Sequence, residues 1–256
     1  AARGVADPAG WQRRGQHRPG RDAAGVGALM RIHTVRLAAA DPAALGAYYA
    51  DTLGAQVVTT TDQVEIALGH SRLIFERADR VAGVYHFAVN IPERKLGAAW
   101  AWLDGRVAWL RADGATTEFV DHVEWQASAL YFEDPAGNIV ELIARHTLPD
   151  ERAVAFSNAD LLEVSEIGIA AANVEAVRDR ISARFGLPVY GEASATFSAL
   201  GDERGLLILV VAGRAWFPER RHAALPMPAR VEAEQDGRRF TIACDEHGID
   251  LIDWPC

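Results

Sequence analysis

The sequence predicts an α+β fold in which small sheets are built from a repeated unit of one strand, one helix and three further strands. Two observations lead to this prediction. Short stretches with the alternation of a strand recur along the chain, and several of them are followed by one stretch with the pattern of an amphipathic helix. Half of the 256 residues are apolar, which is enough for one large or two modest domains with a buried core.

The first unit begins at Met30. The segment RIHTVRLAAA (31–40) has the pattern of a strand. A helix is expected from Asp41, because aspartate is a good N-cap and Pro42 suits the first helical position. Three short strands should follow, in QVVTT (56–60), VEIALG (64–69) and SRLIFER (71–77).

The pattern then repeats with decreasing completeness. The second unit has strands at 84–92, 116–122, 128–134 and 139–145 and a helix at 93–103. The third has strands at 163–174, 188–191, 196–201 and 205–211 and a helix at 175–186. The fourth, RRFTIACDEHGIDLID (238–253), keeps two strands and no clear helix. The content of each unit favours paired βαβββ modules, each curling a small sheet, over a solenoid or a propeller.

We expect two halves in one chain, residues 30–147 and 161–256, joined by a linker over residues 148–160. The first 29 residues are rich in Ala, Gly and Pro and show no periodicity. This composition predicts a disordered or non-native extension, with Met30 as the natural start.

The bulk composition restricts the partners. A net charge of −9 argues against nucleic acid. Cys244 and Cys256 show no pairing pattern, which favours a reducing, cytoplasmic compartment. The longest apolar run, 206–211, is too short to span a bilayer, so no membrane partner is expected. Whether the chain forms a homo-oligomer stays open.

The hairpin ALYFEDPAGNIVELIAR (129–145) raises the question of function. Glu141 shares one face of its strand with Ile139 and Ile143 and so points where apolar residues point. A buried carboxylate must be paired or bound to a metal. The alternatives are a glutamate at a wet sheet edge or one paired with Arg145.

Three segments, YYADTLGA (48–55), YHFAVNIP (85–92) and YFEDPAGNIVELI (131–143), resemble the vicinal oxygen chelate superfamily of glyoxalase I, bleomycin-resistance proteins and extradiol dioxygenases. The resemblance covers residues 30–145 well and 161–211 moderately. It implies modules whose sheets form cupped, open barrels. A metal in the cup would be held by the first strand of each module and the last strand of the second.

Carried over residue by residue, the resemblance implies that His33, His86 and Glu141 bind a divalent metal, Fe(II) or Mn(II), because two imidazoles and a carboxylate suit such ions. His33 lies one residue before the family position, which here is Thr34. A bulge within 38–40 would absorb the extra residue. Otherwise His33 is an ordinary surface or core histidine.

The run from Val120 to Glu141 also matches the local pattern of extradiol dioxygenases. It implies that His122 and Tyr131 hydrogen-bond the substrate's oxygens or the bound dioxygen, and that His70 lies near the acid–base position. Taken alone, each of these three has an ordinary explanation, as an edge cap, a core aromatic or a turn residue.

The resemblance therefore implies a metal-dependent enzyme of the extradiol dioxygenase type that acts on a small molecule, a catechol or another compound with vicinal oxygens. One alternative is a glyoxalase-like lyase or isomerase, which would need a second carboxylate such as Glu76. Another is a metal-free binding protein of the bleomycin-resistance type.

The second half departs from the family pattern. Glu166, and no histidine, occupies the comparable first-strand position. We expect this half to be a degenerate structural copy, with the aromatic residues of GRAWFP (213–218) packed at the barrel mouth.

Overall fold

The computed structural model describes residues 30–148 and 155–254. The predicted N-terminal extension, Cys256 and part of the predicted linker lie outside the described residues. Within the described ranges, no helix is long and apolar enough to cross a membrane.

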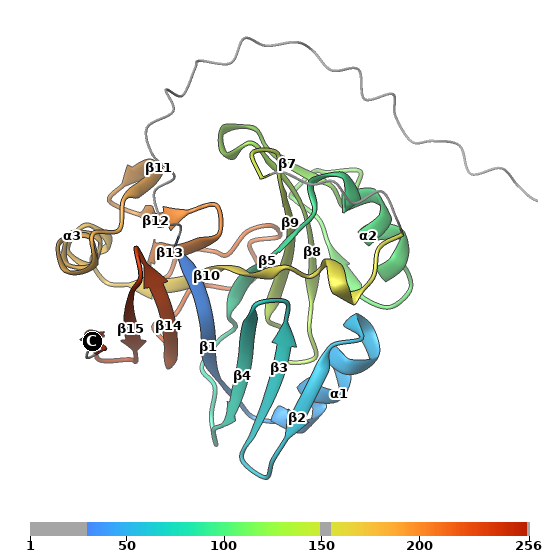
Figure 1. Ribbon diagram of the computed structural model, residues 1–256, viewed down its shortest axis with the longest axis horizontal. Helices are drawn as coiled ribbons and strands as arrows, with labels where there is room; N and C mark the ends of the chain where they lie inside the picture. Colours follow the sequence, from blue (N-terminus) through green and yellow to red (C-terminus); the bar gives the residue numbers. More distant parts are fainter. Residues whose placement is uncertain (1–29, 149–154, 255–256) are drawn as a thin grey trace, which may run out of the picture.

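The described strands form two mixed sheets (Figure 1). The seven-stranded sheet has the order β16-β15-β14-β1-β4-β3-β2 and contains β1 (Arg31–Ala39), β2 (Gln56–Thr59), β3 (Gln63–Leu68), β4 (Ser71–Arg77), β14 (Ala229–Gln235), β15 (Arg238–Cys244) and β16 (Ile249–Asp253).

The nine-stranded sheet has the order β11-β12-β13-β10-β5-β9-β8-β6, with β7 paired to β8. Its strands are β5 (His86–Ile91), β6 (Ala108–Leu110), β7 (Val120–His122), β8 (Ala127–Glu133), β9 (Ile139–Arg145), β10 (Glu163–Ala171), β11 (Val189–Ser194), β12 (Phe197–Asp202) and β13 (Gly205–Val211). The two open sheets with few helices confirm the predicted α+β fold.

The strand pairing runs across the two halves of the sequence. β1 pairs with β14, so the first unit joins the fourth, and β5 pairs with β10, so the second unit joins the third. Each sheet therefore combines strands from residues 30–147 with strands from residues 161–256. The fourth unit has three strands, because the segment ARVEAEQ also forms a strand, β14.

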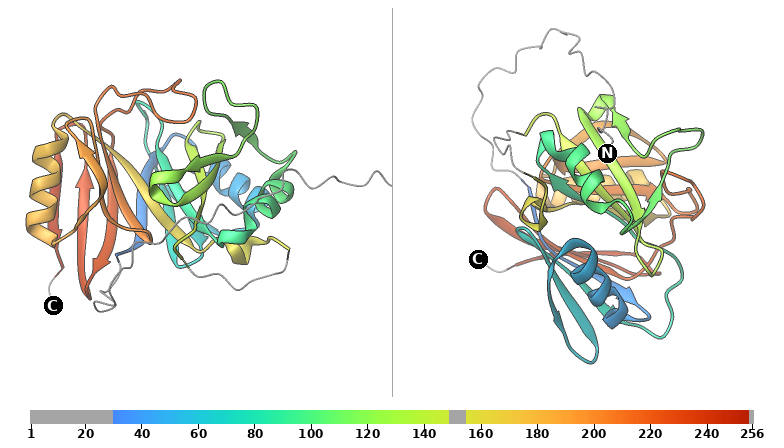
Figure 2. Two further views of the ribbon diagram at one scale, coloured as in Figure 1. Left: turned by 90° about the horizontal axis from the view of Figure 1, so that it is seen from above. Right: turned by 90° about the vertical axis from the view of Figure 1, so that its right-hand side faces the viewer.

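Three α-helices cover the sheets: α1 (Pro42–Leu53), α2 (Leu96–Leu103) and α3 (Val174–Phe185). Short 3-10 turns occur at η1 (Glu93–Lys95), η2 (Val123–Trp125) and η3 (Asn158–Asp160). α1 begins as predicted, because the Asp41 side chain accepts a hydrogen bond from the Ala44 backbone N–H at 3.2 Å. Gly54 ends it in the left-handed conformation, with φ of 59°. α3 packs on β12 and β13 at the outside of the molecule (Figure 2).

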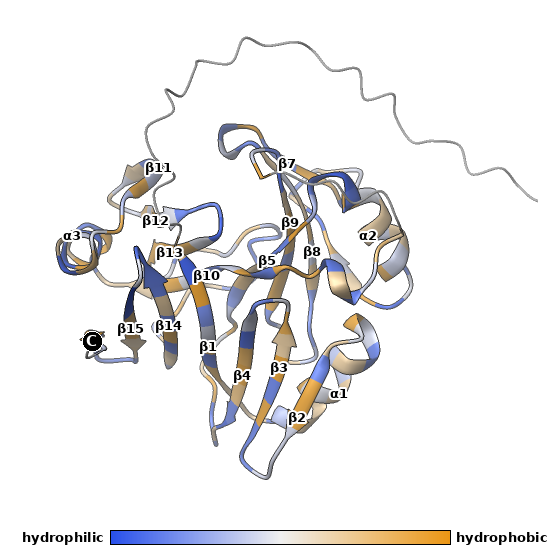
Figure 3. Cartoon of the chain, viewed as in Figure 1, coloured by the Kyte–Doolittle hydropathy of each residue, from blue (hydrophilic) through white to orange (hydrophobic). Residues whose placement is uncertain are grey.

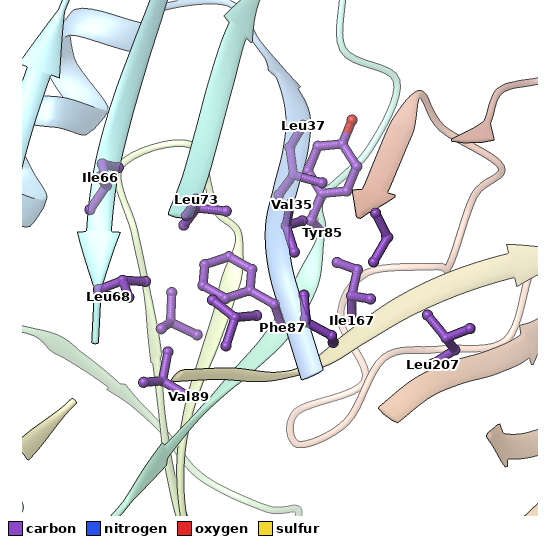
Figure 4. Packing of buried hydrophobic residues seen from close by; sticks show 14 of the residues in the cluster. Val35, Leu37, Ile66, Leu68, Leu73, Tyr85, Phe87, Val89, Ile167 and Leu207 are labelled. Carbon is purple, nitrogen blue, oxygen red and sulfur yellow. The ribbon is translucent and has the colours of Figure 1, made fainter. Parts of the chain in front are cut away.

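Apolar side chains from both sheets form one large core cluster, and a second, smaller cluster includes Tyr131 and Trp216. Buried apolar residues alternate with more exposed residues along β3, as Figure 3 shows, so one face of this strand turns inward. Val35, Phe87 and Ile167 are fully buried where the two sheets face each other (Figure 4). Full burial of side chains of this size contributes roughly 1.5–3 kcal/mol each. This packing fixes β5 and β10, the two strands that support the site described next.

Candidate functional site

A cavity of about 570 Å³ opens on the nine-stranded sheet, which is within the range of small-molecule sites. Asp121 and Arg214 line it, and five further polar residues come from neighbouring strands: His86, His122, Tyr131, Glu141 and Glu166. Its apolar wall consists mainly of Val120, Trp125, Ile143, Phe197, Ile208 and Phe217. The strand pairing of the second and third units therefore creates this cavity.

Glu141 lies at the centre of the polar group. It is opposite Tyr131 in the β8–β9 register and opposite Ala88 in the β5–β9 register, and its side chain is only 5 % exposed. Its Oε2 is 3.3 Å from His86 Nε2, and its Oε1 is 3.9 Å from His122 Nε2. Each carboxylate oxygen therefore faces a different imidazole.

The turn before Glu141 holds its register. The Asp134 carboxylate accepts hydrogen bonds from the backbone N–H groups of Ala136 at 2.9 Å and Asn138 at 3.0 Å. Gly137 adopts φ of 78°, a backbone conformation that favours glycine. Because side chains alternate along a strand, this fixed turn directs Glu141 to the cavity face.

The surroundings keep Glu141 ionised. Burial alone disfavours its carboxylate, but the hydrogen bond and charge of His86, the charge of His122 and the nearby Tyr131 hydroxyl outweigh burial and lower the pKa of Glu141. Burial and the Glu141 charge raise the pKa of Tyr131 well above its ordinary value. The phenol is therefore neutral, and its hydroxyl hydrogen-bonds His122 Nε2 at 2.7 Å.

A second carboxylate, Glu166, lies in the same cavity and is bound by Arg145. Burial raises the pKa of Glu166 to about 7, an effect that Arg145 opposes and Glu141 increases. The Arg145 guanidinium is fully buried, and its Nε and Nη1 have no hydrogen-bond partner among the described residues. The sequence left open that Arg145 pairs with Glu141; the structure pairs it with Glu166.

An aromatic wall closes one side. Trp216 contacts the His86 ring edge-on at 5.5 Å between centroids, and Phe217 contacts His122 at 5.8 Å and Tyr131 at 5.4 Å. This confirms the expected packing of the 213–218 segment. Arg214 from the same segment lines the cavity with its guanidinium 5.2 Å from the Phe197 ring centroid.

Four of the six predicted site residues lie together: His86, His122, Tyr131 and Glu141. The structure does not bring His33 and His70 to this cavity. His33 Nε2 is 3.4 Å from Glu234 Oε2, and both histidines line a second cavity. The register irregularity of β1 lies between Ile32 and Thr34, at His33 itself, and not within 38–40.

The sequence did not indicate the roles of Arg145 and Arg214. Neither arginine lies at a fixed distance from a sequence motif that would identify it as a site residue. The sequence places Glu166 on the first strand of the second half, but its position in the cavity depends on the β5–β10 pairing.

The donor set does not fit the predicted metal centre as the side chains stand. Within residues 30–148 and 155–254, no group of three or more His, Cys, Asp or Glu side chains is placed to hold a metal ion. His86 and Glu141 are suitable donors, but Glu166 is bound by Arg145. The buried charge of Arg145 would repel a divalent cation beside Glu166.

Comparisons with known proteins agree with this fold. Residues 34–143 match the family model of a glyoxalase-like domain. No curated protein matches the sequence.

Solved structures show the same architecture. One is a Bacillus subtilis protein described as a "putative dioxygenase", 16 % identical, with a TM-score of 0.54; the match covers 72 % of this chain and 64 % of that one. Two mutants of glyoxalase I from Zea mays are 12 % and 13 % identical, with TM-scores of 0.54 and 0.52. These matches cover 87 % and 85 % of this chain and 93 % of each maize chain. Such identities show a shared fold. Residues 34–143 therefore resemble a glyoxalase-like domain, and the chain shares the two-module fold of these glyoxalase and dioxygenase structures.

Proposed function

We propose that the protein is an enzyme that moves a proton on a small molecule with neighbouring oxygen atoms, a glyoxalase-like isomerase or lyase. The observation that carries this proposal is the buried Glu141 carboxylate, which lies between His86 and His122 at the polar end of an aromatic cavity. The Glu141 carboxylate is ionised and lines the cavity, so it is available to accept a proton from a bound ligand.

The chemistry follows from the position of each group. Glu141 accepts a proton from a carbon next to a carbonyl, and the electron pair moves onto the carbonyl oxygen to give an enolate. The neutral Tyr131 hydroxyl, bonded to His122, donates a hydrogen bond to that oxygen. The proton of the neighbouring hydroxyl moves to that oxygen, and Glu141 then returns its proton to the former carbonyl carbon, so that the carbonyl now stands on the neighbouring carbon. His86 holds the carboxylate in place.

The cavity lining indicates the kind of substrate. Trp125, Phe197 and Phe217 offer flat apolar surfaces that suit an apolar or aromatic body. Arg214 supplies a cation at the same wall and makes no ion pair within the described part of the chain. A carboxylate or a phenolate on the substrate would find its partner there.

The test is proton exchange with solvent. The full chain is incubated in D₂O with a panel of small α-hydroxycarbonyl and dicarbonyl compounds, and loss of the C–H signal is followed by ¹H NMR. We expect exchange with the wild type and a loss of at least 10²-fold in the isosteric Glu141→Gln variant. Glu124→Gln, an exposed neighbour outside the cavity, is the matched control. Equal exchange by both variants would contradict the assignment of Glu141.

A second candidate is the extradiol-type dioxygenase. The observation that favours it is the pair His86 and Glu141 on adjacent parallel strands, together with His122 and Tyr131 bonded to each other in the same cavity. Oxygen uptake with a panel of catechols, after anaerobic purification and metal analysis, separates this candidate from the first. Iron- or manganese-dependent oxygen uptake that His86→Gln abolishes would favour the dioxygenase.

A further inference from the structure

A second cavity, of about 170 Å³, lies where the two sheets meet, and none of its lining residues belongs to the first cavity. The seven-stranded sheet contributes Arg31, Ile32 and His33 from β1 and His70 from the β3–β4 turn. The nine-stranded sheet contributes Glu163 from the start of β10 and Arg204 from the β12–β13 turn. Four of these six side chains are basic or can become cationic.

The one carboxylate in the lining is already balanced. Glu163 is buried, and its Oε1 accepts hydrogen bonds from Asn90 Nδ2 at 3.1 Å and from Arg204 Nη1 at 3.2 Å. Glu234, which lies beside His33, is also bonded by Arg239 Nε at 3.2 Å. The acidic groups around this cavity therefore have cationic or amide partners of their own.

Several basic groups of this cavity lack an ion pair or leave a nitrogen atom without a hydrogen-bond partner among the described residues. Arg31 is exposed and makes no ion pair within the described residues. Arg204 Nε is buried and lacks a hydrogen-bond partner in the described part of the chain, and His33 Nε2 lies near Glu234 without hydrogen-bond geometry. A buried donor without an acceptor costs about 1–3 kcal/mol, so an acceptor from solution would relieve this cost.

We propose that this cavity is a binding site for a small anion bearing a phosphate or carboxylate group. Arg31 provides a charge that is unpaired within the described ranges and, with His33 and His70, donors from the seven-stranded sheet; Arg204, which also bonds Glu163, provides donors from the opposite side. A divalent cation is disfavoured, because both guanidinium groups would repel it and the described residues offer no cluster of three metal ligands. Charge-assisted hydrogen bonds from arginine suit either anion.

A bound anion would connect the two sheets, since its donors come from β1 and the β3–β4 turn on one side and the β12–β13 turn on the other. Such a ligand binds the folded chain and not the unfolded one. It therefore raises the unfolding temperature as its concentration rises above the dissociation constant. This site is separate from the proposed catalytic cavity, so either can fail without the other.

The test measures thermal unfolding and binding heat of the full chain with inorganic phosphate, succinate and citrate, each against sodium chloride at equal ionic strength. The variants are Arg31→Gln and His70→Gln, singly and together, because both side chains are exposed and the core is left unchanged. Arg94→Gln, an exposed arginine outside the cavity, is the matched control.

We expect at least one anion to raise the unfolding temperature of the wild type and of Arg94→Gln by several degrees. The double variant should bind that anion at least tenfold more weakly. A response to phosphate alone would identify the ligand as a phosphate compound, and a response to succinate or citrate alone would identify it as a carboxylate. No anion-specific shift in the wild type, or an equal shift in the double variant, would overturn the proposal.

Discussion

Arg145 and Glu166 form a buried ion pair that joins β9 to β10. Along β9, Arg145 lies two residues after Ile143 and four after Glu141, so the three share one face of the strand. The pair neutralises the second carboxylate of the cavity. It leaves Glu141 as the carboxylate that faces His86 and His122. The chemistry proposed for the cavity depends on this division between the two glutamates.

Removing Arg145 should destabilise the fold strongly. Arg145→Met leaves the Glu166 carboxylate buried without its cation, and breaking a buried pair in this way costs about 3–5 kcal/mol. Urea unfolding at neutral pH measures the loss. The double variant Arg145→Met/Glu166→Leu should recover part of it, because no buried charge remains. A single-variant loss below about 1 kcal/mol would show that the pair is not structurally important.

Tyr131→Phe should reduce turnover by about 10²-fold and leave the fold intact, because it removes one hydrogen-bond donor and no apolar volume. His122→Gln should have an effect in the same direction. The measurement is the exchange rate in D₂O alongside a circular dichroism spectrum. If Tyr131→Phe keeps full activity, the phenol does not stabilise the enolate.

Arg214→Gln should weaken the binding of anionic ligands and spare neutral ones. The guanidinium is exposed, so its pairing with a ligand carboxylate is worth at most about 1 kcal/mol, or roughly fivefold in affinity. Calorimetric titration with matched pairs, such as an aromatic acid and its amide, measures the difference. Equal losses for the acid and the amide would mean that Arg214 acts by shape and not by charge.

The buried pair of Lys95 and Asp160 should make the free energy of unfolding depend on pH in the acid range. Their Nζ–Oδ1 distance is 2.7 Å. Burial alone would raise the pKa of Asp160, but the hydrogen bond from Lys95, a backbone N–H and the Lys95 charge together lower it. A lowered folded-state pKa gives stability that is complete above the unfolded value of about 3.9 and is lost as pH falls through the folded value.

The urea unfolding of the wild type and of Asp160→Asn at several pH values tests whether this stability is lost as pH falls. At pH 7 the variant should unfold at lower urea concentration than the wild type. The difference should shrink once the pH drops below about 4. A difference that stays constant down to pH 2.5 would show that the Asp160 charge contributes nothing to folding.

The inward direction of Glu141 could be predicted from sequence because the information is local. The turn at 134–138 sets the register, and alternation carries it to Glu141 and, on the partner strand, to Tyr131. His122 could be placed for the same reason, since β7 and β8 are joined by a short connection.

The place of His33 could not be predicted, because it depends on an irregularity in the β1–β14 pairing at that residue. The partner strand, β14, lies almost 200 residues further along the chain. Its charged residues obscure the pattern by which a strand is predicted from sequence. Likewise, the first strand of each unit can pair with a strand of another unit, and the sequence does not show which two units pair. The β5–β10 pairing that brings Glu166 and Arg145 to the cavity follows from the packing of the whole chain.

Because the described donor set does not fit a metal, we expect Glu141 to transfer the proton without one, and the exchange rate of metal-stripped protein tests this most directly. The rate is measured on the best compound of the panel, before and after Fe(II), Mn(II) or Zn(II) is added back. We expect the same rate in every sample and its loss in Glu141→Gln. A rate that is zero in the stripped protein and returns only with one metal would contradict the account and make the cavity a metal centre.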